Sequence, residues 1–417
     1  MIRLAIGAGL LAFAAVPAQA ETTVDWLHIE AVEGTAAIME AAAKEYEAAH
    51  PDVKINVQFL ENEAYKAKLT TLLQSDAAPD IFYSWGGGVM SEQVEAGVLR
   101  PIGDVLSAEA RAAIGEAGIS AFTRDNSLYG LAQNVSQVVF WGNKDLLDQA
   151  GVGADDMKTW DGFLASVKKI KDAGITPITV GAQDKWPAHF YWSYLVVRQA
   201  GQAAFDAARA GEGDGFAGAP FVKAGQMFLD LVAMEPFQDG FLAANFSSAS
   251  GSFGDGKAAL HLMGNWDYTV QRDNSASGNG LSDDQLAIFP FPTVEGGAGD
   301  PADTLGGING WIFHRDAPDE AVKFMEWYTS NEVQSRFAAA SVYIPIVAGS
   351  ADSLANPYFK EISDNINKAK WHAIFFDQEL GKDVGGVVND ISAELSDNAI
   401  SAEEAAELVK EAVDDSL

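Results

Sequence analysis

The chain has 417 residues, no cysteine and a formal net charge of −32, so it is long, free of disulfides and strongly acidic. Without cysteine it has no thiolate chemistry. Its charge repels nucleic acid and anionic lipid, argues against an anionic ligand and permits a neutral one.

The first 20 residues have the pattern of a secretory signal peptide. Arg3 precedes an apolar stretch from residue 4 to 15, and Ala18-Gln19-Ala20 forms a small-residue cleavage site. The apolar run is too short to span a bilayer, and no later segment offers a membrane span. We therefore expect a periplasmic protein without stable membrane insertion, whose mature chain starts at Glu21. Its length predicts about two domains.

The first part of the mature chain alternates strands and helices. Strands are expected at 24–29, 53–59 and 81–83, with helices at 34–49 and 63–75. This order predicts a parallel sheet with helices on both faces. Ligands in such sheets gather beyond the carboxyl ends of strands. Glu30 and Trp85 follow two of these ends.

A second α/β run begins after residue 130. Strands are expected at 135–141, 177–180, 258–263 and 285–291. Helices are expected at 143–150, 160–173 with Thr159 as its cap, 188–199, 219–234, 319–330, 332–340, 357–369 and 402–413. The chain has no repeat of fixed period and no low-complexity linker. We therefore expect two lobes joined by short crossovers.

Tryptophan recurs where strands are expected to end. A Gly/Asp turn and a strand lead into Gly264-Asn265-Trp266, and Trp85, Trp186 and Trp371 have similar places. An indole face suits the C–H face of a sugar ring, and Asn265 and Asp267 are able to bond its hydroxyls. The alternative is that Trp266 only covers the edge of a core. Spacing alone does not decide between these two interpretations.

Enzyme motifs fail on their context. Residues 251–257 match a phosphate loop, but Ala258 stands where Ser or Thr should hold magnesium, and a strand follows instead of a helix. Residues 213–218 match a dinucleotide fingerprint but follow a helical stretch. The histidines lack zinc-site spacing, and no nucleophile elbow occurs. A glycoside hydrolase would need two carboxylates across a cleft, and no pair stands out. We expect no catalytic residue, cofactor or metal.

Several motifs occur in one order along the mature chain. They are Pro79-Asp80-Ile81-Phe82-Tyr83-Ser84-Trp85, residues 138–147, Thr159-Trp160-Asp161, residues 253–266 and Gly306-Gly307-Ile308-Asn309-Gly310-Trp311. Together they resemble the family 1 extracellular solute-binding proteins, the carbohydrate-binding subunits of bacterial ABC importers, of which maltose-binding protein is the familiar member. The resemblance covers essentially the whole mature chain.

The resemblance implies a two-lobe periplasmic binding protein fold, an α/β fold with a parallel-rich sheet in each lobe and the ligand cleft between lobes. One lobe would comprise 21–131 plus 293–330, and the other 132–292 plus 331–417. The chain would be a monomer that captures a neutral sugar or oligosaccharide by closure and delivers it to the membrane permease subunits of an ABC importer. Alternatives are a binding protein for a polyol or polyamine, or an exported glycoside hydrolase.

The resemblance also implies ligand-binding positions in the cleft. These are Trp266, Trp85, Trp186, Asp184, Trp371, Glu30, Asn134 and Asn309, beside the Asn265 and Asp267 already noted. Some relatives place charged ligand contacts where this chain has Gly86-Gly87-Gly88, so the identity of the sugar is not transferred.

Overall fold

The structure is a computed structural model that describes residues 21–417, and the predicted signal peptide lies outside the described residues. Within residues 21–417, no helix is both long enough and apolar enough to cross a membrane.

The first lobe begins with the predicted alternation of strands and helices. Its elements are β1 (Thr22–His28), α1 (Glu33–Ala49), β2 (Val53–Phe59), α2 (Asn62–Leu72) and β3 (Ile81–Ser84). β1 pairs in parallel with β2 and with β3, which confirms the parallel sheet expected here. Helix α1 buries Met39, Ala42 and Tyr46 on one face, as its 3.6-residue period requires. Smaller elements complete this part: α3 (Gly87–Glu95), α4 (Ala108–Ala121), β4 (Thr123–Arg124) and β5 (Ser127–Leu128).

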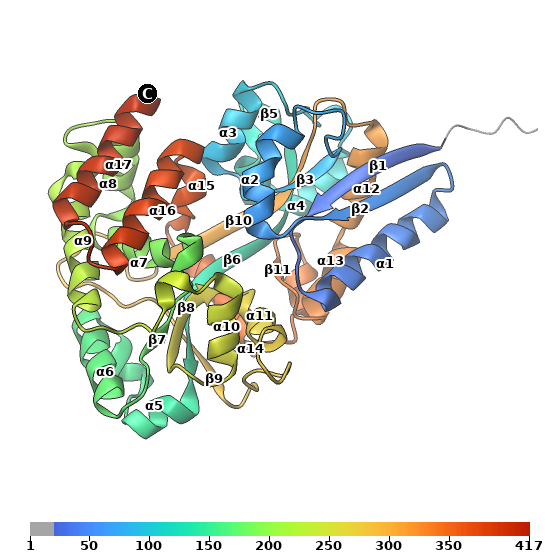
Figure 1. Ribbon diagram of the computed structural model, residues 1–417. Coiled ribbons are helices and arrows are strands. Elements are labelled where there is room, and N and C mark those ends of the chain that lie inside the picture. Colours follow the sequence, from blue (N-terminus) through green and yellow to red (C-terminus); the bar gives the residue numbers. More distant parts are fainter. Residues whose placement is uncertain (1–20) are drawn as a thin grey trace, which may run out of the picture.

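Two long antiparallel strands connect the lobes. They are β6 (Gly130–Asn143) and β10 (Thr304–Phe313), which lie in the middle of a sheet of order β2-β1-β3-β10-β6-β8-β7. Figure 1 shows both strands running between the two halves of the molecule. β10 was not predicted, because its glycines resemble a loop. They are needed for close strand approach: a methyl group on Gly306 would lie 1.8 Å from the carbonyl oxygen of Ser136.

The second lobe follows β6. Its elements are α5 (Lys144–Ala150), α6 (Trp160–Asp172), β7 (Ile178–Thr179), α7 (Trp186–Gln199), α8 (Gly201–Arg209), α9 (Ala219–Val232), α10 (Phe246–Gly254), β8 (Leu260–Gly264), α11 (Asp267–Asp273) and β9 (Leu286–Phe289). Thr159 caps α6 by accepting from the Gly162 amide at 3.2 Å, as predicted. β7 pairs in parallel with β8, whereas β6 is antiparallel to both β8 and β9. The sheet of this lobe is therefore mixed.

The last part of the chain contributes elements to both lobes. Its elements are α12 (Asp319–Tyr328), α13 (Asn331–Ala339), β11 (Ile344–Pro345), α14 (Pro357–Lys368), β12 (His372–Ile374), α15 (Phe376–Glu379), α16 (Lys382–Ser396) and α17 (Ala402–Ser416). In Figure 1, α12 and α13 lie with the blue first lobe, and α15, α16 and α17 lie with the second lobe.

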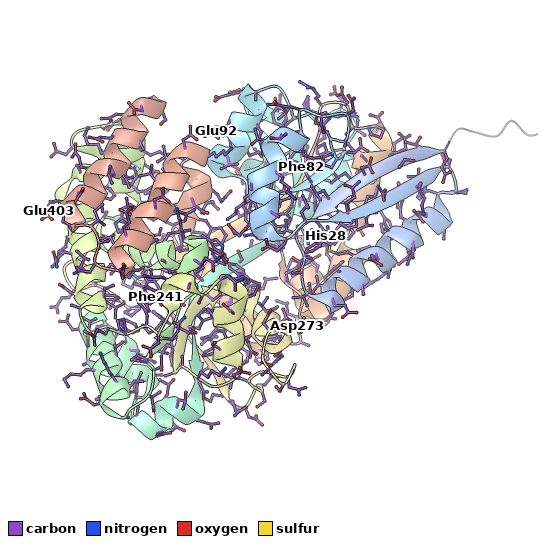
Figure 2. The ribbon with its side chains drawn as sticks, in the orientation of Figure 1. His28, Phe82, Glu92, Phe241, Asp273 and Glu403 are labelled. Carbon is purple, nitrogen blue, oxygen red and sulfur yellow. The ribbon has the colours of Figure 1, made fainter. Side chains whose placement is uncertain are left out.

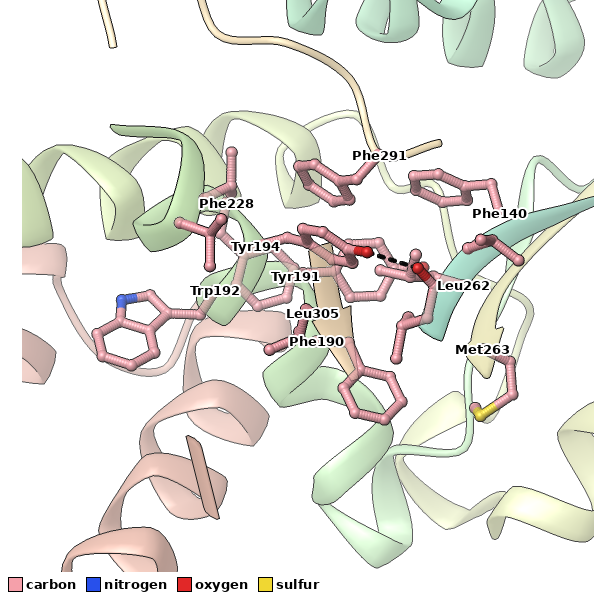
Figure 3. Close-up of a cluster of buried hydrophobic side chains, with 14 of the residues drawn as sticks. Phe140, Phe190, Tyr191, Trp192, Tyr194, Phe228, Leu262, Met263, Phe291 and Leu305 are labelled. Carbon is pink, nitrogen blue, oxygen red and sulfur yellow. Dashed lines mark hydrogen bonds between the residues drawn. The ribbon is translucent and has the colours of Figure 1, made fainter. Parts of the chain in front are cut away.

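Each lobe has its own hydrophobic core. The first core gathers around Trp26, Trp311 and Tyr328. The second contains Tyr194 stacked on Phe291, with ring centroids 4.5 Å apart (Figure 3). The predicted lobe boundaries stay a prediction. Several residues, however, lie in the core of the lobe to which these boundaries do not assign them: Leu305 in the second core, and Ala132, Val333, Phe337 and Tyr343 in the first.

Candidate ligand-binding cleft

A cavity of about 910 Å³ lies between the two lobes. The carboxyl ends of three strands meet there, because Glu30 follows β1, Trp85 follows β3 and Trp266 follows β8. Glu30, two residues after the end of β1, and Asp273, at the end of α11, line the cavity from opposite lobes; Figure 2 labels Asp273 and, close to Glu30 in the chain, His28. Side chains of both lobes therefore reach the same space.

Trp266 lines the cavity from the second lobe. It lies between β8, which ends at Gly264, and α11, which begins at Asp267, and its ring packs edge-on against Phe375 with centroids 6.0 Å apart. The ring folds back over Gly264: a methyl group there would lie only 2.0 Å from the indole. The Gly264-Asn265-Trp266 sequence therefore holds a partly exposed indole at the cavity wall.

Trp85 and Trp186 line the same cavity from opposite lobes. Trp85 is held edge-on by Tyr83, with centroids 5.2 Å apart. Trp186 packs against Phe246 at 4.9 Å. Its indole Nε1 donates a hydrogen bond of 3.0 Å to Glu63 on α2, which joins the two lobes directly.

The crossing strands β6 and β10 supply polar groups to the cavity. Asn309 donates to the Oδ1 of Asn134 at 2.9 Å, and both residues line the space together with Ser136 and Tyr343. Ser136 Oγ and Asn309 Oδ1 are buried without a hydrogen-bond partner among the described residues. Because buried polar groups are normally paired, these groups are candidates for ligand contacts. Glu30 is nearby, and burial raises its pKa to about 7.

A buried charged group adds to the wall of the cavity. Asp377 on α15 lies 3.7 Å from Lys66 Nζ of α2 and 3.3 Å from His189 Nε2 of α7. Burial favours the neutral carboxyl, but nearby Lys66 and His189 and a hydrogen bond of 3.1 Å from Gln378 outweigh it and hold the pKa of Asp377 well below its usual value. Asp377 is therefore ionised, and its lysine partner comes from the other lobe.

Three of the expected ligand contacts lie outside the cavity lining. Asp184 accepts from the Phe246 amide at 2.7 Å and so holds the start of α10. Asp267 is 0% exposed and accepts from Ser250 Oγ at 2.6 Å. Each carboxylate therefore bonds the protein behind the wall, and a role of either residue in ligand contact stays a prediction.

Trp371 is the third residue outside the lining. Its ring packs against Phe205 with centroids 5.4 Å apart, and its amide donates to Asp303 at 2.9 Å. Asn265 does line the cavity, but its Oδ1 accepts from the Gln137 amide at 3.1 Å. That side chain ties β8 to β6.

The sequence reasoning missed several lining residues, among them Lys66, His189, Asp377, Ser136 and Phe375. Asp377 follows a strand, as Glu30 does, but β12 has only three residues and gives no periodic signal. Lys66 and His189 lie on helices, where sequence spacing does not indicate which residues face the other lobe.

A family model for the bacterial extracellular solute-binding proteins matches residues 31–335. The chain belongs to this family. The match confirms the resemblance found in the motifs, and it extends across both lobes.

Relatives by sequence carry general names. An uncharacterized ABC transporter extracellular-binding protein of Pyrococcus horikoshii is 27% identical over 232 residues, which are 54% of this chain and 52% of the relative. An osmoprotective compounds-binding protein of Synechocystis is 24% identical over 296 residues, 68% of this chain and 67% of the relative. The chain thus spans about half the length of the first of these relatives.

Solved structures match over nearly the whole chain. One, from work on xylan utilization by the thermophilic bacterium Caldanaerobius polysaccharolyticus, has a TM-score of 0.86 and 25% identity, covering 93% of this chain and 99% of that one. A chitin oligosaccharide binding protein has a TM-score of 0.85 and 25% identity, covering 95% and 98%. These matches confirm the two-lobe α/β fold.

Proposed function

We propose that this protein captures a neutral sugar or oligosaccharide in the cleft and delivers it to the membrane permease of an ABC importer in the periplasm. One observation carries the proposal. The cavity between the lobes combines three indole rings with buried polar groups that lack partners within the described chain.

A sugar matches both features of the cavity. Its ring has an apolar C–H face that stacks on indole, and its hydroxyls both donate and accept hydrogen bonds. Trp85, Trp186 and Trp266 provide the aromatic surfaces. Ser136 is able to donate or accept, whereas the free oxygen of Asn309 only accepts. A ligand rich in hydroxyls satisfies this mixture better than one with donors alone.

The charge of the wall supports a ligand that is not anionic. Carboxylates at positions 33, 61, 273 and 377 line the cavity. Lys66 is the only lysine or arginine among the described lining residues, and Asp377 already partners it. An anionic sugar would therefore meet repulsion from most of the wall.

The mechanism we propose is ligand-gated closure. The lining residues come from both lobes, so a bound ligand contacts both and stabilises the closed arrangement by its differential affinity for it. The Trp186–Glu63 hydrogen bond is a direct contact between the lobes in this structure. The permease would then recognise the closed pair of lobes, and no covalent step is required.

Structures that are 25% identical support a saccharide, since one comes from work on xylan utilization and one is a chitin oligosaccharide binding protein. The Synechocystis relative supports the alternative of a polyol-like solute, because its name refers to osmoprotective compounds. The acidic wall leaves a polyamine as another alternative.

A ligand screen tests the proposal. Thermal shift and tryptophan fluorescence of the mature protein would be recorded with neutral mono- and oligosaccharides, polyols and amines, followed by calorimetry on each hit. A bound ligand raises the apparent stability by mass action. Responses to neutral sugars support the proposal, whereas responses only to polyols or amines overturn it. Release of reducing sugar from an oligosaccharide would instead indicate a hydrolase.

A further inference from the structure

Two indoles and a carboxylate surround the ammonium group of Lys66. Its Nζ lies 5.4 Å from the ring centroid of Trp85 and 5.8 Å from that of Trp186. The same atom lies 3.7 Å from Asp377 Oδ2. Trp85 shares the first lobe with Lys66, and Trp186 and Asp377 belong to the second. We call Trp85, Trp186 and Asp377 the ammonium cage.

The ammonium cage has the chemistry of a site for cationic ligands. A cation within about 6 Å of an aromatic centroid is attracted by the ring quadrupole, and several rings around one ammonium group form an aromatic cage. Asp377 adds an ionised carboxylate that is 7% exposed. In this protein, however, the occupant of the cage is a side chain of the protein itself.

The rest of the cleft would attract amines. Glu33, Glu61 and Asp273 line the same cavity without another lysine or arginine among the described lining residues. A cationic ligand would therefore be drawn into the cleft, where its best site is already filled. Lys66 would repel it at that site because like charges repel strongly in a partly buried environment.

We propose that Lys66 is a specificity-determining residue, whose ammonium group fills the ammonium cage and thereby excludes ligands that carry an ammonium group. The inference rests on the proposed function in one respect, namely that the cleft binds a small solute. It adds a reason why an acidic, tryptophan-rich cleft takes neutral ligands.

Lys66→Ala tests this inference, with choline chloride as the probe. The substitution empties the cage, and alanine favours the helix in which residue 66 lies. Calorimetry and tryptophan fluorescence on the full mature protein are expected to show choline binding at least about tenfold tighter than in the wild type. Lys66→Gln, which removes the charge but keeps a longer side chain, is expected to change in the same direction.

Two control variants isolate the cage from general charge effects. Lys68→Ala makes the same charge change on the same helix at an exposed position, and its choline affinity should equal that of the wild type. Adding Trp85→Leu to Lys66→Ala removes one wall of the cage and should abolish the gain. Circular dichroism establishes that each variant is folded.

The inference is overturned if neither folded Lys66 variant gains choline affinity, if Lys68→Ala gains as much, or if the wild type already binds choline equally well. The proposed function is decided separately, by the sugar screen on the wild type. A choline gain in the Lys66 variants without any wild-type sugar response would support the role of Lys66 and overturn the sugar proposal. A wild-type sugar response without a choline gain in the Lys66 variants would support the sugar proposal and overturn the role of Lys66.

Discussion

Trp266 is held at the cavity wall by local backbone geometry, because only a residue without a side chain fits at Gly264 beneath its ring. We predict that Trp266→Ala weakens binding of the cognate sugar by about 1–3 kcal/mol, as truncation of a central aromatic contact does. Calorimetry measures the change. Trp371→Ala is the control, since that indole lies outside the cavity lining. Equal affinity of Trp266→Ala and wild type would contradict the stacking role.

Glu30 makes the stability of the ligand-free protein depend on pH. Burial raises its pKa from 4.5 to about 7. Between these values the unfolded chain has lost the proton and the folded chain keeps it, so stability falls as the pH rises and levels off above about 7. Glu30→Gln removes this loss. Its free energy of unfolding should rise relative to wild type over that range, by at most about 3 kcal/mol.

Urea denaturation at intervals between pH 4 and 8 measures the effect of Glu30→Gln. Glu295→Gln, at an exposed loop position, is the control and should show no such trend. A difference between Glu30→Gln and wild type that does not change with pH would show that the carboxyl group has an ordinary pKa.

At the residue scale, sequence position indicated which residues lie near the cavity but not the direction of every side chain. Trp85, Trp186 and Trp266 follow strand ends and do line the cavity, whereas Asp184 and Asp267 have comparable places and bond inward. A residue that directly follows a strand lies at the edge of the sheet that borders the cavity. The direction of its side chain depends on neighbours distant in sequence, such as Ser250 for Asp267.

At the scale of one element, helix α16 contains two adjacent glycines in different environments. A methyl group on Gly385 would lie 2.1 Å from the carbonyl oxygen of Asp377, whereas one on Gly386 meets nothing within 4 Å. We predict that Gly385→Ala lowers the free energy of unfolding by about 1–3 kcal/mol through overpacking against α15. Gly386→Ala should raise it by about 0.5–1 kcal/mol, since alanine favours a helix.

Urea denaturation of the two variants gives the comparison directly. Because the residues are neighbours in one helix, each serves as the control for the other. Equal effects of Gly385→Ala and Gly386→Ala would mean that α15 moves freely away from α16, which would contradict the close packing described here.

Element prediction succeeded for elements such as β2, but it missed β10 and several helices, among them α4, α10, α11 and α16. The bounds of β2 match the predicted strand at both ends, because burial of Val53 and Ile55 alternates with exposure of Lys54 and Asn56. β10 and α10 were missed, since their glycines indicate a turn when they are considered alone. In α10, Gly254 allows contact with α11: a methyl group there would lie 2.1 Å from the carbonyl oxygen of Gln271.

At the scale of the whole molecule, β6 and β10 couple the two cores. In β6, Leu131 belongs to the first core and Phe140 to the second. In β10, Trp311 belongs to the first core and Leu305 to the second. We predict that the lobes unfold in one transition, because loss of either core disrupts strands shared with the other. Scanning calorimetry should give equal calorimetric and van't Hoff enthalpies, and two separated transitions would contradict the coupling.

The sequence by itself determined the order of most strands and helices, the family and the three tryptophans that line the cavity. It did so because burial of one face leaves a period in the chain, and because strand ends gather at one edge of a sheet. Only the tertiary structure decided which side chains cross between lobes. Lys66 and Asp377 lie far apart in the sequence, and their pairing depends on how the lobes meet, which leaves no local pattern.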